Sequence, residues 1–176
     1  FMNAELPVIK KGRKFDQVLE GARDVFLVDG FGAANMDHVA KASGVSKATL
    51  YSYFADKESL FIAVIQTICA HQAEQAMQHI DQSAPPADVL SSAARHLLGF
   101  MTSEFGQRIF RICVAEADRF PDLGLAFYQS GPMVVREKIG EYLHDATAKG
   151  LLDIVDCDLA ADQFSELCKA DVFPKI

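Results

Sequence analysis

The sequence of 176 residues has no tryptophan, four cysteines and no apolar run approaching the roughly 18 residues that a membrane-spanning helix needs. The cysteines are scattered along apolar stripes without a C-x-x-C pair, so we expect buried thiols rather than a disulfide framework or a zinc site. The first residues also lack the cationic segment and apolar core of a cleavable signal. We therefore expect a soluble, cytoplasmic protein without a membrane partner.

Enzyme motifs are missing as well. The sequence contains neither G-x-S-x-G nor H-E-x-x-H, and residues 30–35 lack the third glycine of a dinucleotide-binding loop. One expected helix carries five polar side chains on a single face: His71, Glu74, Gln75, Gln78 and His79. A metal site there would need further ligands that the sequence does not specify, so a solvated polar face is the favoured interpretation. We predict no catalytic residue, no metal and no cofactor.

Positive charge is scarce overall but unevenly distributed. The formal net charge is −7. Residues 1–60 hold eight Lys and Arg against eight Asp and Glu, so the acidic excess lies entirely in residues 61–176. A basic cluster stands near the N-terminus: Lys10, Lys11, Arg13 and Lys14. The acidic total argues against indiscriminate coating of nucleic acid, but a small N-terminal module with a few well-placed cations remains compatible with it.

Apolar residues recur with a helical period almost throughout, and no segment shows the alternation of a strand. The first stripe runs through residues 15–26 and stops at 29–32, where glycines favour the left-handed conformation that ends helices. Asn35 and Ser46 are expected to cap two short helices, separated by a tight turn with Gly44 at a positive-φ position. These features predict an all-α fold.

A long helix is expected to begin after Asp56 and to continue without a breaker to about Ile80. Further helices follow, separated by proline or glycine at 83–86, at Pro121, at 131–132 and at 149–150. The last helix is expected to begin at Asp156 or Asp158. The pattern therefore predicts three short N-terminal helices followed by a helical bundle.

Residues 36–54 have the spacing of a helix-turn-helix, whose second helix lies in the major groove of DNA. Its expected exposed side holds small and polar residues: Ser46, Lys47, Ala48, Thr49, Tyr51 and Tyr53. Lys47 is suited to guanine O6 and N7, and Ala48 and the Thr49 methyl group to thymine methyl groups. Hydroxyl groups and Lys57 are suited to phosphates. The spacing alone is also compatible with a packed helical hairpin that binds no DNA.

The residues of this motif carry a resemblance. Residues 44–60 read GVSKATLYSYFADKESL, and the stretch 14–65 is similar to the N-terminal domain of the TetR family of bacterial transcriptional regulators. The resemblance implies a DNA-binding domain at 1–55, a ligand-binding and dimerisation domain at 56–176, and a dimer that binds a palindromic operator. It places Lys47, Thr49, Tyr51, Tyr53 and Lys57 at family DNA-contact positions. Asn35 is a further predicted DNA-contact residue, at a position where the family usually has Ser or Thr.

Residues 119–173 resemble one C-terminal subtype of the same family. The family's C-terminal domain usually ends in a further long helix, which domain 56–176 is expected to lack. The resemblance places the dimer interface in the last helices, with four candidate apolar contacts: Leu159, Phe164, Leu167 and Val172. It implies a repressor that a small-molecule effector releases from its operator.

Candidate ligand-pocket residues come from the helices after the long one: His96, Phe100, Phe105, Cys113, Glu116 and Tyr128. For each residue alone, filling a helical core is the more common role. One alternative function also stays open at this point. The chain could be a helical ligand-binding protein or an enzyme whose helix-turn-helix is only structural.

Overall fold

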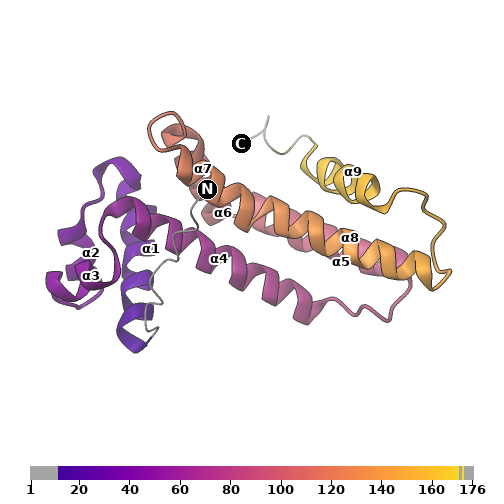
Figure 1. The fold of residues 1–176 in the computed structure, drawn as a ribbon, viewed down its shortest axis with the longest axis horizontal. Coiled ribbons are helices and arrows are strands. Elements are labelled where there is room, and N and C mark those ends of the chain that lie inside the picture. Colours follow the sequence, from indigo (N-terminus) through magenta and orange to yellow (C-terminus); the bar gives the residue numbers. More distant parts are fainter. Residues whose placement is uncertain (1–11, 171, 173–176) are drawn as a thin grey trace, which may run out of the picture. The chain divides into compact units, whose positions relative to one another are not determined.

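The structure is a computed structural model that describes residues 12–170 and residue 172. All regular elements in this part of the chain are helices, which confirms the all-α prediction (Figure 1). None of these helices is long and apolar enough to cross a membrane. Lys10 and Lys11 of the basic cluster fall outside the described residues. The chain divides into an N-terminal unit, residues 1–64, and a C-terminal unit, residues 65–176.

The N-terminal unit contains α1 (Arg13–Ala33), α2 (Met36–Ala42), α3 (Lys47–Tyr53) and the start of α4 (Lys57–His79). Helix α1 does not end in the glycine region, as the sequence predicted, but kinks there and continues for one more turn. Gly30 forms the kink with φ 73° and ψ 169°. The extra turn places Phe31 in the core, so burial of that ring accounts for the continuation.

Side-chain caps define the short helices, as predicted. The Asn35 side chain accepts a hydrogen bond from the His38 N–H at 2.9 Å, which caps α2. The Ser46 hydroxyl accepts one from the Thr49 N–H at 3.1 Å, which caps α3. Between them, Gly44 adopts φ 62°. These contacts satisfy donors that a helix N-terminus otherwise leaves unpaired.

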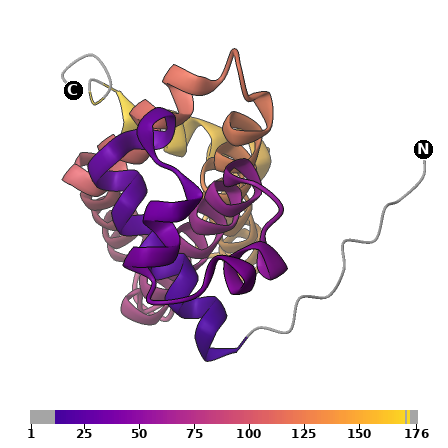
Figure 2. The same cartoon turned by 90° about the vertical axis from the view of Figure 1, so that its left-hand side faces the viewer.

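Two close contacts hold the N-terminal unit together. The rings of Phe26, Phe31 and Phe61 meet with centroid distances of 4.8–6.0 Å, which joins α1 to the first turns of α4. Helix α1 also approaches the end of α2 so closely that a Cβ atom on Gly21 would lie 2.3 Å from the Ser43 Oγ. Figure 2 shows α2 and α3 beside α1. The helix-turn-helix is therefore built on a closed aromatic core.

The C-terminal unit comprises the rest of α4 and five further helices: α5 (Pro86–Thr102), α6 (Glu104–Glu116), α7 (Pro121–Ser130), α8 (Pro132–Ala148) and α9 (Cys157–Lys169). Four of the five breaks lie at the predicted prolines and glycines. The fifth, between α5 and α6, lies at Ser103, whose hydroxyl caps α6 by accepting from the Gly106 N–H at 3.0 Å. Asp156, rather than Asp158, caps α9 by accepting from the Leu159 N–H at 2.9 Å. A small core forms where α8 packs on α9.

The two units meet within α4, between Val64 and Ile65. The first turns of α4 belong to the N-terminal core because Leu60, Phe61 and Val64 are buried there. The predicted functional boundary at residues 55 and 56 therefore lies at the start of α4, slightly before the division between the compact units, and it stays a prediction.

Candidate DNA-binding surface and ligand cavity

The N-terminal end of α3 presents the residues expected to meet DNA. Ser46, Lys47 and Ala48 are exposed. The Ser46 and Thr49 hydroxyl oxygens lie 2.9 Å apart, so these two side chains support each other as well as the cap. Tyr51 is half exposed, and it lines a shallow hollow together with Asn35. The structure thus brings five of the eight predicted DNA-contact residues to the accessible side of the helix-turn-helix.

Tyr53 and Lys57 have additional roles inside the unit. The Tyr53 ring packs edge-on against Phe15 at 5.5 Å, so it is partly buried. The Lys57 ammonium donates to the carbonyl oxygens of Phe31, Gly32 and Ala34 at 2.6, 3.2 and 3.0 Å. It also lies 4.5 Å from the centroid of the Phe31 ring. Lys57 therefore closes the carbonyl end of α1, and its predicted phosphate contact stays a prediction.

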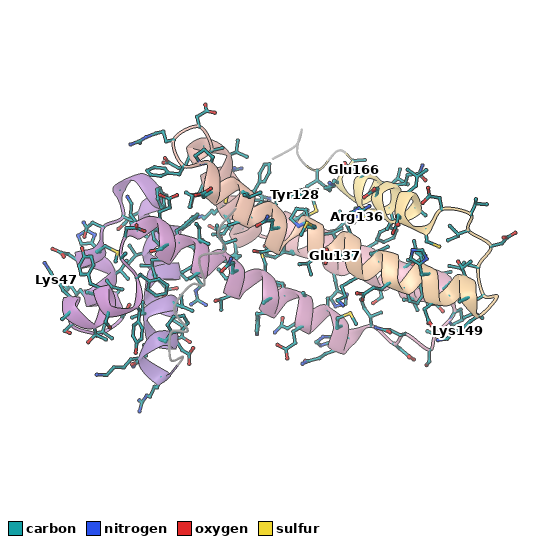
Figure 3. All side chains as sticks on the ribbon, in the orientation of Figure 1. Lys47, Tyr128, Arg136, Glu137, Lys149 and Glu166 are labelled. Carbon is teal, nitrogen blue, oxygen red and sulfur yellow. The ribbon has the colours of Figure 1, made fainter. Side chains whose placement is uncertain are left out.

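The sequence reasoning missed Asp37. Lys47, labelled in Figure 3, is the first residue of α3. Its Nζ donates to the Asp37 Oδ2 in the first turn of α2 at 2.6 Å. Both side chains are well exposed, at 63% and 60%. Water screens such a pair, so its contribution to stability is small, but DNA must compete with the carboxylate for this ammonium. Asp37 stands ten positions before Lys47 in the sequence, so no local sequence pattern pairs the two residues.

The C-terminal unit contains a cavity of about 390 Å³. Its walls come from α4, α5, α8 and α9, with a few residues from the connections between helices. Most wall residues are apolar, including Ala73, Leu97, Ile139 and Phe164. The volume lies within the range of small-molecule sites, at its lower end. The cavity lies wholly in residues that belong to this unit.

Two of the six predicted pocket residues line this cavity, His96 and Phe100, both on α5. The other four belong to α6 and α7, which contribute only Ser130 to the lining. The ring centroids of Phe105 and Phe100 are 6.3 Å apart, and Cys113 is buried. A carboxylate oxygen of Glu116 lies 3.9 Å from the Arg119 guanidinium, and Tyr128 is exposed. The rest of the wall comes mainly from the second half of α4 and from α8, which supply seven lining residues each.

The cavity holds little net charge. Lys138 donates to Glu141 at 2.7 Å, and Lys149 outside the lining donates to the lining residue Asp145 at 2.6 Å. Burial raises the pKa of the Cys69 thiol, also a wall residue, to about 11. That thiol is protonated at neutral pH, so it acts as an apolar wall group and not as a nucleophile.

The polar face of α4 shows short side-chain contacts of its own. His79 donates through Nδ1 to the Gln75 carbonyl oxygen at 2.7 Å, and His71 lies 3.5 Å from the Gln75 amide nitrogen. No group of three or more potential metal ligands gathers anywhere in the described residues. Of this face, Gln75 and His79 line the cavity.

The residues predicted for a dimer interface differ in exposure. Leu159 and Leu167 are exposed on α9, at 52% and 76%. Phe164 is partly buried because it lines the cavity, and Val172 lies beyond the end of α9. Leu151, in the connection between α8 and α9, is another exposed apolar side chain. Leu159 and Leu167 therefore leave exposed apolar surface on α9.

Known proteins share both parts of this architecture. Residues 18–64 match the family of bacterial regulatory proteins of the tetR type, and residues 88–176 match the C-terminal domain of AefR-like transcriptional repressors. The transcriptional regulator UidR of Escherichia coli K12 is 27% identical over 135 residues, which cover 76% of this chain. That match spans 66% of UidR, slightly less than two thirds of its length.

Solved structures agree with this result. The flavonoid-responsive regulator FrrA is 37% identical, with a TM-score of 0.75 over 92% of this chain and 82% of its own. A TetR-family regulator from Mesorhizobium loti is 26% identical, with a TM-score of 0.77 over 88% of this chain and 78% of its own.

The fold and the capped α2–turn–α3 segment define a helix-turn-helix protein. Together with these matches, they show that the chain belongs to the TetR family of bacterial transcriptional regulators, which is not a family of enzymes.

Proposed function

We propose that this protein is a transcriptional repressor that binds a palindromic operator through α3. The observation that carries the proposal is the N-terminal end of α3, where Ser46 caps the helix and Lys47 and Ala48 are exposed, as contact with base edges requires. Phosphate contacts fall to hydroxyl groups around them, with Asn35 and Tyr51 at the edge of the same surface.

Gel-shift titration of Lys47→Ala on operator DNA tests the base contact. Removing the ammonium is expected to cost about 1–3 kcal/mol on the preferred site and to relax the preference at one base position. Arg23→Ala is a matched control, because that cation lies in the same unit and pairs with its neighbour Asp24. A uniform loss on all DNA sequences would contradict base readout by Lys47.

We also propose a homodimer. Two recognition helices related by two-fold symmetry enter successive major grooves about 34–36 Å apart, which doubles the number of bases that are read. The exposed apolar side chains of Leu159 and Leu167 on α9 support this proposal as contacts of the dimer. Light scattering at micromolar concentration is expected to give twice the chain mass, and Leu167→Glu to lower it. A monomeric wild type would overturn the dimer.

The cavity is the proposed effector site. FrrA responds to flavonoids, and we propose that an aromatic small molecule acts on this protein as well. Because α4 continues from the N-terminal unit into the cavity wall, a ligand that shifts it can alter the presentation of α3. If the ligand weakens DNA binding by a given factor, linkage requires that operator DNA weaken ligand binding by the same factor. Calorimetry with and without operator tests this, and equal ligand affinities would refute effector release.

A further inference from the structure

Two histidines face the cavity from different helices. His79 belongs to the last turn of α4 and His96 to α5, and both line the cavity. Their ring centroids are 5.9 Å apart. His79 is exposed and His96 partly buried, so the pair lies where the apolar walls meet solvent.

Both rings are held in the same tautomer. The His79 Nδ1 lies 2.7 Å from the Gln75 carbonyl oxygen, and the His96 Nδ1 lies 2.9 Å from the Ser92 carbonyl oxygen. A carbonyl oxygen can only accept, so each Nδ1 carries the hydrogen. The neutral rings therefore keep Nε2 as an acceptor, and no described residue donates a hydrogen bond to either one.

The rest of the lining decides the charge of a fitting ligand. Lys138 is the cationic side chain among the described wall residues apart from the histidines, and Glu141 pairs with it. A ligand carboxylate or phosphate would thus meet no unpaired lysine or arginine in the described wall. The free-energy cost of its desolvation would not be offset by an ion pair. Apolar walls with Phe100 and Phe164 favour a flat hydrocarbon body.

We propose that His79 and His96 form a hydrogen-bond acceptor pair that selects an uncharged aromatic ligand carrying a hydroxyl group. The hydroxyl donates to an Nε2 atom of the pair, while the ring system enters the apolar part of the cavity. The proposal rests on the proposed effector role of the cavity. It adds the chemical class of the ligand and the two residues that recognise it. Of the two, the sequence predicted only His96 in the pocket and His79 on a solvated face.

Calorimetric titration of the DNA-free protein at pH 7.5 tests the pair, with unsubstituted flavone and its monohydroxy derivatives as probes. At least one monohydroxyflavone is expected to bind about tenfold more tightly than flavone, the value of one well-placed hydrogen bond. The double variant His79→Phe/His96→Phe is expected to lose this preference and to keep its affinity for flavone.

His71→Phe is the matched control, because His71 lies on the same face of α4 but outside the lining. It is expected to retain the full preference. Circular dichroism checks the folding of each variant, and His79→Met/His96→Met replaces the phenylalanine pair if that pair disturbs the helices.

Three outcomes would overturn the proposal: no probe binds, flavone and all its monohydroxy derivatives bind equally, or the preference survives in the folded double variant. Operator gel shifts run in parallel separate this failure from failure of the proposed repressor. Operator gel shifts without a preference for hydroxylated ligands would refute only the proposed role of the histidine pair. A histidine-dependent ligand preference without any operator gel shift would refute the proposed repressor function but not the proposed ligand site.

Discussion

The two units of this protein are packed in different ways. The large side chains that are almost completely inaccessible fall mainly in the N-terminal unit: Val18, Phe26, Val39, Leu50, Leu60, Phe61 and Val64. In the described part of the C-terminal unit, its first residue Ile65 and Leu123 have this property. The C-terminal unit instead has many partly buried side chains and a cavity of about 390 Å³.

This difference matches the two tasks proposed for the units. Reading DNA requires α3 to stand in one orientation, and a closed core with capped helices enforces it. Admitting a ligand requires unfilled volume, which lowers stability because wall atoms lose packing partners. A ligand that fills the cavity is therefore expected to stabilise the C-terminal unit by mass action.

The largest expected effect comes from the aromatic core. Phe26→Ala removes a fully buried ring that contacts both Phe31 and Phe61, and it is expected to cost about 3–5 kcal/mol. Phe100→Ala, at a cavity wall that is only partly buried, is expected to cost about 1 kcal/mol. Urea unfolding followed by circular dichroism measures both. Equal losses would contradict the difference in packing.

Two glycine substitutions, one in each unit, are expected to change the stability of the protein in opposite directions. On Gly21 a Cβ would meet the backbone nitrogen and Cα of Ser43 at 2.7 and 2.8 Å, so Gly21→Ala must push α1 and α2 apart. We expect a net loss of about 2 kcal/mol. On Gly99, inside α5, a Cβ meets nothing within 4 Å, so Gly99→Ala is expected to stabilise by up to about 1 kcal/mol. Melting temperatures that shift in the same direction would refute this assignment.

Lys57 tests whether the N-terminal unit depends on one internal cation. Lys57→Met keeps the aliphatic stem but leaves the carbonyl oxygens of Phe31, Gly32 and Ala34 without the ammonium. The expected cost is about 1.5 kcal/mol, read as a lower melting temperature. Salt-dependent gel shifts on the same variant show whether a phosphate contact is lost as well. An unchanged melting temperature with a flatter salt slope would assign Lys57 to DNA alone.

The smallest expected effect concerns the surface of the same unit. Asp37→Asn removes the competitor for the Lys47 ammonium and is expected to raise operator affinity by up to about fivefold, since exposed ion pairs contribute about 0.2–1 kcal/mol. Asp24→Asn, which makes the same charge change on α1, is the control. Equal gains in affinity in both variants would indicate a general effect of charge instead of specific competition by Asp37 for the Lys47 ammonium.

Features that depend on local interactions could be predicted from the amino-acid sequence. Helical periodicity and the prolines and glycines predicted the order of the helices, and the caps at Asn35 and Ser46 follow from residues three positions apart. The turn at Gly44 is local for the same reason. The resemblance of residues 14–65 indicated the TetR family, and the matches to known proteins confirm it.

Contacts between side chains far apart in the sequence depend instead on how the helices pack. Lys57 contacts carbonyls 23–26 positions earlier, and Lys47 pairs with Asp37 ten positions earlier, across a turn whose geometry no periodicity specifies. The cavity combines α4 with α5, α8 and α9, and this arrangement left Phe105, Cys113, Glu116 and Tyr128 outside it. A helix's own pattern shows that it has an apolar face, but the partner of that face depends on how all the helices pack together.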